Sequence, residues 1–220
     1  MKRINRIQGQ VKEILLNAEA GHDWHHIQRV CVNAKKILKY EVANEEIVML
    51  GCLLHDIADP KFHQGDEEIG PRIANKLLQK AGYTEEIQLE IETIIRGISF
   101  KNSFQVSSNP SIEFQIVQDA DRLDALGAVG IARTFHYGGF KNRKLFDETI
   151  PPVIHQDKST YTKSTSPTVN HFYEKLLLLK DKMNTSTAKQ IASQRHEFML
   201  TYLNHFFDEV GVDEKNPWKE

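Results

Sequence analysis

The strongest constraint in this chain is a run of eight residues, 47–54, that contains no charged side chain. Asn44 stands just before it as a suitable helix N-cap, and two glutamates follow where the helix dipole favours acidic residues. We expect this helix to end at Pro60. Because a helix this apolar must be buried on most sides, the rest of the chain has to surround it with other elements.

The remaining segments have the spacing of amphipathic helices. Apolar residues recur every three or four positions between glycines, prolines and capping residues. No alternating pattern of useful strand length occurs, and there is no internal repeat or low-complexity tract. The sequence therefore predicts an all-α fold, with helices over residues 3–19, 23–40, 44–60, 70–82, 84–97, 109–135, 166–179 and 185–211.

The domain organisation follows from length and from one irregular stretch. A chain of 220 residues fits one large domain or two small ones. Gly138-Gly139, Pro151-Pro152 and a Ser/Thr-rich tract at 159–168 mark a long segment that we expect to be functional or mobile. We predict a single domain, with a core over residues 1–137 and, over residues 138–220, a long loop and a C-terminal helical pair packed on that core.

Composition excludes several classes of protein. Hydrophobic residues make up 40% of the chain and the formal net charge is −2, which disfavours disorder and binding to a nucleic-acid polymer. No apolar run approaches the roughly 18 residues of a membrane span, and the basic N-terminus has no apolar signal core behind it. Cys31 and Cys52 lie in apolar helical patterns, as small buried hydrophobes do. We therefore expect a cytoplasmic protein, monomeric or homodimeric, with no membrane or nucleic-acid partner.

Histidine and aspartate side chains occur on faces that are otherwise apolar. His55-Asp56 comes at the end of the uncharged helix, where a carboxylate is costly unless it is paired or bound to a metal. Taken alone, this dipeptide could be explained without a metal, as a histidine at a helix end and an aspartate paired with a neighbouring arginine. However, His26 shares an inward face with Val30, and Asp121 lies on a mid-helix apolar stripe. Imidazole and carboxylate together suit a divalent transition metal.

Two ambiguities concern which acidic residues belong to such a site. His22-Asp23 is a second His-Asp dipeptide, but Asp23 directly precedes a helix and is predicted to be its N-cap. In the later helix, Asp119 lies about 200° around the axis from Asp121, whereas Asp124 shares the face of Asp121 and remains the alternative to it.

Three motifs together carry a family resemblance. They are His22-Asp23-Trp24-His25-His26 followed by Arg29-Val30, His55-Asp56-Ile57-Ala58-Asp59-Pro60-Lys61-Phe62, and Asp119-Ala120-Asp121-Arg122-Leu123-Asp124-Ala125-Leu126-Gly127. With them, the sequence resembles the HD-domain metal-dependent phosphohydrolase superfamily over about residues 5–136. It looks most like a bacterial branch similar to (deoxy)nucleoside triphosphate pyrophosphohydrolases.

The resemblance implies a helical HD-domain core and a set of metal ligands, namely His26, His55, Asp56 and Asp121. One divalent transition metal is expected, because no histidine occurs between His63 and His136 to hold a second. Mn²⁺ is the first choice, with Ni²⁺, Co²⁺, Fe²⁺ or Zn²⁺ as alternatives.

The implied reaction is attack of metal-bound water on phosphorus, splitting a nucleoside triphosphate into monophosphate and pyrophosphate. A nucleoside monophosphate phosphatase and a non-catalytic metal- or nucleotide-binding regulatory protein are the alternatives. Asp59 and Lys61, in the second motif, are the expected catalytic residues beside the metal. The expected substrate-binding residues are Arg29, Arg122, Arg133 and His22.

Overall fold

The structure is a computed structural model that describes residues 2–17, 23–58, 63–98, 110–154, 166–213 and 217–218. Within these residues it contains helices and no strand, so the predicted all-α fold is confirmed. The chain divides into two compact units, Met1–Asp121 and Arg122–Glu220. The division predicted from the sequence, into residues 1–137 and 138–220 of one domain, stays a prediction.

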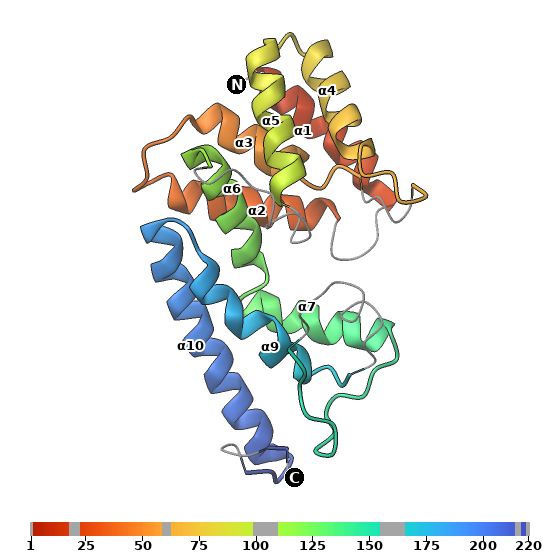
Figure 1. Cartoon of the computed structure of the whole chain (residues 1–220), viewed down its shortest axis with the longest axis vertical. Coiled ribbons are helices and arrows are strands. Elements are labelled where there is room, and N and C mark those ends of the chain that lie inside the picture. The colour runs from red at the N-terminus through yellow and green to blue at the C-terminus, as the bar shows by residue number, and fades with distance from the viewer. Residues whose placement is uncertain are drawn as a thin grey trace. The chain divides into compact units, whose positions relative to one another are not determined.

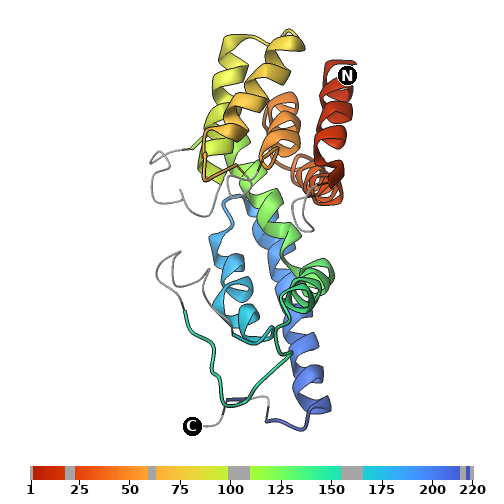
Figure 2. The same cartoon turned by 90° about the vertical axis from the view of Figure 1, so that its right-hand side faces the viewer.

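The first unit surrounds the uncharged helix, as its composition requires. This helix is α3 (Glu45–Leu54), and every residue from 47 to 54 is buried. It packs against three other helices, α1, α2 and α5 (Figures 1 and 2). The unit consists of α1 (Lys2–Ile14), the 3₁₀ helix η1 (Leu15–Asn17), α2 (Trp24–Ile37), α3, α4 (Ile69–Lys80), α5 (Glu85–Ile98) and α6 (Ile112–Asp124) up to Asp121.

Gly51 lets two helices approach α3 closely. A Cβ atom at this position would lie 2.9 Å from Cγ2 of Val117 on α6 and 3.3 Å from Cδ1 of Ile94 on α5. A larger residue at this position would therefore require the Val117 side chain to shift. Because Val117 is one helical turn before Asp121, this close contact brings the Asp121 end of α6 toward α3.

The helix starts agree with the sequence, but the end of α3 does not. Asp23 caps α2 by accepting a hydrogen bond from the His26 amide, and Asn44 caps α3 by accepting from two amides of its first turn. The predicted end at Pro60 is wrong, because α3 ends at Leu54 and His55 is its C-cap. The His55-Asp56 dipeptide therefore lies in the turn that leaves the helix. Pro60 itself lies outside the described residues.

The single helix predicted over residues 109–135 is also wrong. The chain instead forms α6 and α7 (Gly127–Phe140), and the break follows Asp124. Gly127 has a φ of +73°, a left-handed conformation that L-residues other than glycine adopt at a cost. The apolar pattern continues across the break, so its periodicity did not reveal it.

The second unit is built on one long C-terminal helix, α10 (Ser186–Glu209), which the Thr185 side chain caps by accepting a hydrogen bond from the Ala188 amide. It packs against α7 and the 3₁₀ helix η3 (Leu176–Lys182). The predicted helix over 166–179 is in fact α9 (Asn170–Glu174) followed by η3. The predicted irregular stretch begins within α7, which extends to Phe140. Residues 141–154 contain no helix or strand, and residues 155–165 lie outside the described part.

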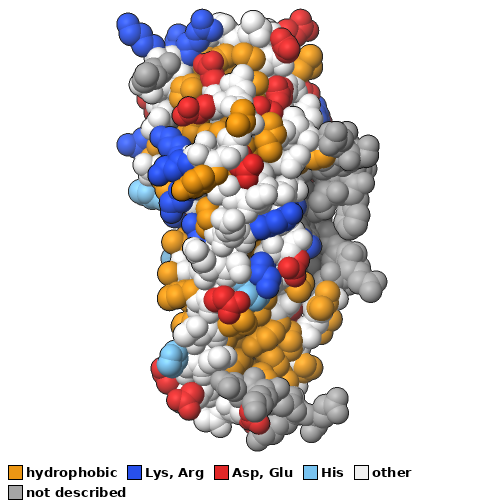
Figure 3. Space-filling view, turned by 90° about the vertical axis from the view of Figure 1, so that its left-hand side faces the viewer, with side chains coloured by type: hydrophobic (Ala, Val, Ile, Leu, Met, Phe, Trp, Pro, Cys, Tyr) orange, Lys and Arg blue, Asp and Glu red, His pale blue; other side chains and the backbone are white. Residues whose placement is uncertain are grey.

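The face of the molecule that Figure 3 shows carries mixed charge. On the face in Figure 3, basic side chains lie among acidic and apolar ones, and the described atoms of this face form no surface of a single sign. No described helix combines the length and the apolar character that crossing a membrane requires.

The break at Gly127 can be tested by substitution. We expect Gly127→Ala to lower the free energy of unfolding by about 1–2 kcal/mol, because the left-handed backbone disfavours a Cβ. That Cβ would also lie 3.0 Å from Cγ of Arg195. The control is Gly139→Ala, also in α7, where an added Cβ meets nothing within 4 Å and helix propensity favours alanine. Urea denaturation measures both, and equal effects of the two substitutions would contradict this account.

Candidate metal centre

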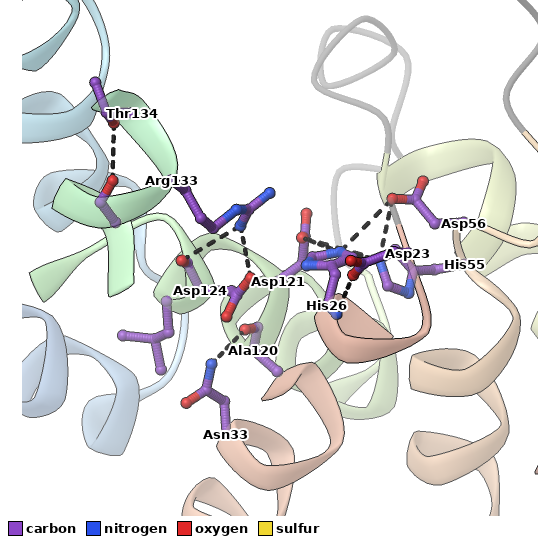
Figure 4. Close-up of polar contacts among 12 residues, drawn as sticks. Asp23, His26, Asn33, His55, Asp56, Ala120, Asp121, Asp124, Arg133 and Thr134 are labelled. Carbon is purple, nitrogen blue, oxygen red and sulfur yellow. Dashed lines mark hydrogen bonds and ion pairs between the residues drawn. The ribbon is translucent and has the colours of Figure 1, made fainter. Parts of the chain in front are cut away.

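Four side chains from three parts of the first unit converge on one point (Figure 4). His26 comes from α2, His55 and Asp56 from the turn after α3, and Asp121 from α6. The two imidazole Nε2 atoms are 3.3 Å apart. Oδ2 of Asp56 lies 3.6 Å and 3.7 Å from them, and Oδ1 of Asp121 lies 3.4 Å and 3.8 Å from them. The structure thus brings together all four predicted ligands.

The cluster has a buried side and an accessible side. The His26 and His55 side chains are 2% and 1% exposed, whereas those of Asp56 and Asp121 are 31% and 33% exposed. The histidines are therefore fixed by packing, and the carboxylates remain within reach of solvent. This arrangement would give a bound ion two nitrogen donors on its buried side and two carboxylates on its accessible side.

A backbone carbonyl orients the His55 ring. Nδ1 of His55 lies 3.0 Å from the carbonyl oxygen of Cys52, one turn earlier. Because a carbonyl can only accept, Nδ1 carries the hydrogen, and a neutral ring then presents the lone pair of Nε2 to the cluster. Histidine ligands in proteins commonly have their second nitrogen bound in this way, which fixes the tautomer and the ring orientation.

The spacing and chemistry of the donors fit a divalent metal. Two donors in neighbouring positions around one ion, each about 2.1–2.3 Å away from it, lie roughly 3.0–3.8 Å apart. The five distances between the nitrogens and their neighbours, from 3.3 to 3.8 Å, fall in this interval. Two carboxyl groups beside two imidazoles offer four donor atoms of the kinds that bind a divalent cation. Mixed nitrogen and oxygen donors favour a transition metal over Mg²⁺.

The second His-Asp dipeptide has a different role, as predicted. Oδ1 of Asp23 accepts a hydrogen bond of 2.8 Å from the backbone amide of His26. The Asp23 carboxylate therefore closes the first turn of α2, and that turn carries a candidate ligand. His22 lies outside the described residues.

The structure separates the three aspartates of the third motif. Oδ1 of Asp121 lies within 4 Å of both imidazole Nε2 atoms. Asp119 is fully buried. Oδ2 of Asp124 accepts a hydrogen bond of 2.6 Å from Nη1 of Arg133, and the Asp124 side chain is 2% exposed. These contacts support Asp121 as the fourth ligand.

The structure describes three of the other predicted site residues, which are arginines. Arg29 is half-buried on α2, one turn after His26. Arg122 donates to the carbonyl oxygen of Lys182, and Arg133 binds Asp124, so both guanidinium groups have partners within the second unit. Asp59 and Lys61 lie outside the described residues. The catalytic and substrate-binding roles of all these residues stay predictions.

Sequence analysis missed two supporting contacts. One is the Cys52 carbonyl, because a backbone acceptor has no signature in a sequence. The other is Asn33, whose Nδ2 donates a hydrogen bond of 3.0 Å to the carbonyl oxygen of Ala120, next to Asp121. Asn33 is seven residues after His26 on α2, so it lies on the same helical face, and a polar residue on a buried face was the available signal.

The two cysteines are free thiols, as expected from their apolar surroundings. Burial raises the pKa of the Cys52 thiol, and a hydrogen bond with Cys31 acts in the same direction. Cys52 is therefore a protonated, small apolar residue in the packing between α2 and α3.

Comparisons with known proteins agree with this geometry. The HD domain family matches residues 23–126, a range that includes all four clustered residues. The Bacillus subtilis protein YpgQ is 36% identical over 215 residues, which are 97% of this chain and 97% of YpgQ.

Solved structures show the same likeness. An HD-superfamily hydrolase from Bacillus thuringiensis is 41% identical, with a TM-score of 0.76 over 96% of this chain and 98% of that one. The structure of YpgQ in complex with ADP is 35% identical, with a TM-score of 0.74 over 94% of this chain and 95% of that one. With a matching family, full-length relatives and the His, His-Asp, Asp cluster in place, the chain belongs to the HD-domain family and is a hydrolase of that superfamily.

Proposed function

We propose that this hydrolase is a metal-dependent phosphohydrolase that splits a nucleoside triphosphate into the monophosphate and pyrophosphate. The observation that carries the proposal is the convergence of His26, His55, Asp56 and Asp121, with spacings that suit one divalent cation. A nucleotide substrate is supported by the relative YpgQ, which has been solved with ADP. The triphosphate specificity rests on the resemblance of the three sequence motifs to the pyrophosphohydrolase branch.

Mn²⁺ is the proposed metal. Two imidazoles and two carboxylates form a ligand set of intermediate hardness, which suits Mn²⁺, Fe²⁺, Co²⁺, Ni²⁺ or Zn²⁺. The accessible carboxylate side of the cluster leaves room for further ligands, and hard Mn²⁺ accepts oxygen ligands from water and phosphate readily. When bound, the cation would lower the pKa of water and neutralise charge on a phosphoryl oxygen.

The protein's own residues have separate roles in this proposal. The buried histidines would fix the ion, and the half-exposed carboxylates would hold it from the side that substrate reaches. Arg29, one turn beyond His26, is the described cation proposed to bind the substrate's phosphates. Asp59 and Lys61, which follow His55-Asp56 in the second motif, are proposed to transfer protons and to neutralise phosphate charge during the reaction.

Product identification tests the reaction. We expect purified protein with Mn²⁺ to release pyrophosphate, and no inorganic phosphate, from at least one nucleoside triphosphate, as measured by phosphorus NMR or ion chromatography. Phosphate release from a monophosphate would show the phosphatase alternative instead. Metal binding with no product from any nucleotide would favour the regulatory alternative and contradict the proposal.

Ligand variants test whether the cluster carries the reaction. We expect His55→Ala and Asp56→Ala each to lower turnover by more than about a hundredfold, because each removes a direct metal ligand. His205→Ala, an exposed histidine on α10, is the matched control and should leave turnover unchanged. Circular dichroism checks that the variants remain folded. Wild-type turnover in a folded His55→Ala protein would place the chemistry elsewhere.

Two neighbouring aspartates can be separated by measuring metal affinity and stability together. We expect Asp121→Asn to weaken Mn²⁺ binding by at least about tenfold in isothermal titration calorimetry, with little loss of stability. Asp124→Asn should instead lower the free energy of unfolding by about 1–3 kcal/mol, because it weakens the bond to Arg133, and should leave the Mn²⁺ affinity unchanged. The reverse pattern would make Asp124 the ligand.

A further inference from the structure

We infer that Asn33 is a positioning residue of the metal centre, which acts by fixing α6, and with it Asp121, against α2. The inference rests on the proposed metal site and adds a residue that none of the three sequence motifs contains. Asn33 lies beyond the first motif on α2, and its amide reaches across to α6 (Figure 4).

The contact joins two ligand-bearing helices at a buried point. Nδ2 of Asn33 donates to the carbonyl oxygen of Ala120 over 3.0 Å, and Asn33 and Ala120 are 4% and 0% exposed. On α2, Asn33 is two turns from His26 along the same face. On α6, Ala120 directly precedes Asp121. The bond therefore ties the backbone beside one ligand to the helix face that carries another.

The hydrogen bond of Asn33 restricts the position of α6 along its axis, which the surrounding apolar contacts do not. Val30 of α2 and Val117 of α6 are fully buried near this level, but apolar packing is non-directional and permits small shifts along a helix axis. A shift of one residue along α6 would move Asp121 by about 1.5 Å. The Nε2 to Oδ1 distances of 3.4 Å and 3.8 Å leave no room for such a shift if both residues are to hold one ion. The directional amide bond opposes the shift.

The burial of the Asn33 amide also has a cost, which its hydrogen bond offsets. A buried amide is unfavourable unless it is hydrogen-bonded, and an apolar residue at this position would pack between the helices without that requirement. A polar residue retained in a buried helix contact is best explained by specificity of alignment, as seen where single buried polar residues fix the register of helices.

The test compares metal affinity with stability in the full-length protein. We expect Asn33→Ala to weaken Mn²⁺ binding about tenfold in isothermal titration calorimetry, in the range found for residues that orient metal ligands. The absorption spectrum of the Co²⁺-loaded protein should also change, because it reports the ligand geometry. Asn33→Ser, a milder change whose hydroxyl is too short to replace the amide, provides the same measurements if the alanine variant does not fold.

Asn170→Ala is the matched control. The Asn170 amide also donates to a backbone carbonyl, that of Ile150, over 2.8 Å, and Asn170 is fully buried in the second unit. Losing this bond should lower stability without changing Mn²⁺ affinity or the Co²⁺ spectrum.

The outcomes separate this inference from the proposed function. Weaker metal binding and an altered spectrum in the Asn33 variants, with neither effect in Asn170→Ala, would support positioning. Wild-type affinity and spectrum in folded Asn33 variants would overturn it, even if their stability falls. If the wild-type protein binds no divalent metal, the proposed metal centre itself fails. If it binds metal but hydrolyses no nucleotide, the proposed reaction fails and the Asn33 measurement still stands.

Discussion

The structure depends most on the approach of two imidazole nitrogens, Nε2 of His26 and Nε2 of His55, to within 3.3 Å of each other. Two buried rings so close, with carboxylate oxygens less than 4 Å from both, form an arrangement that a shared cation stabilises and that little else explains. The first unit must bring two helices and the end of a third to one point with an accuracy of a few tenths of an ångström. Apolar packing around α3 brings them together, and Gly51 permits the closest approach.

Three polar contacts with backbone groups act on the cluster, one for each segment that contributes a side chain to it. The Asp23 carboxylate holds the amide of His26, the Cys52 carbonyl holds the ring of His55, and the Asn33 amide holds the carbonyl before Asp121. Each contact is directional, and each acts on a residue of the cluster or on its immediate neighbour. Helix capping, ring orientation and helix alignment are separate physical effects, and here all three act on the same cluster of four side chains.

The sequence predicted the converging side chains better than the backbone that carries them. Helix starts were predictable because side-chain caps such as Asp23, Asn44 and Thr185 are visible in the sequence. Helix ends were not: α3 ends at Leu54 without a glycine or proline, and Gly127 breaks a continuous apolar pattern by adopting a positive φ. The two histidines were predictable because a polar side chain on a buried face is costly without a purpose, whereas the choice of Asp121 over Asp124 came from the family resemblance. The Cys52 carbonyl was not predictable, because every residue has one.

The arginines show why a sequence motif alone does not assign a guanidinium group to substrate. Arg122 follows Asp121 directly, and Arg133 was expected to bind phosphate because its fork of donors matches phosphate oxygens. The same donors match carbonyls and carboxylates: Arg133 bonds to the Asp124 carbonyl and carboxylate, Arg195 to the Leu123 carbonyl, and Arg122 to the Lys182 carbonyl. Leu123 and Asp124 form the end of α6, where the helix dipole favours positive charge and the last carbonyls need donors. Arginine there stabilises the end of the helix that carries Asp121, a role that the pattern of residues does not distinguish from phosphate binding.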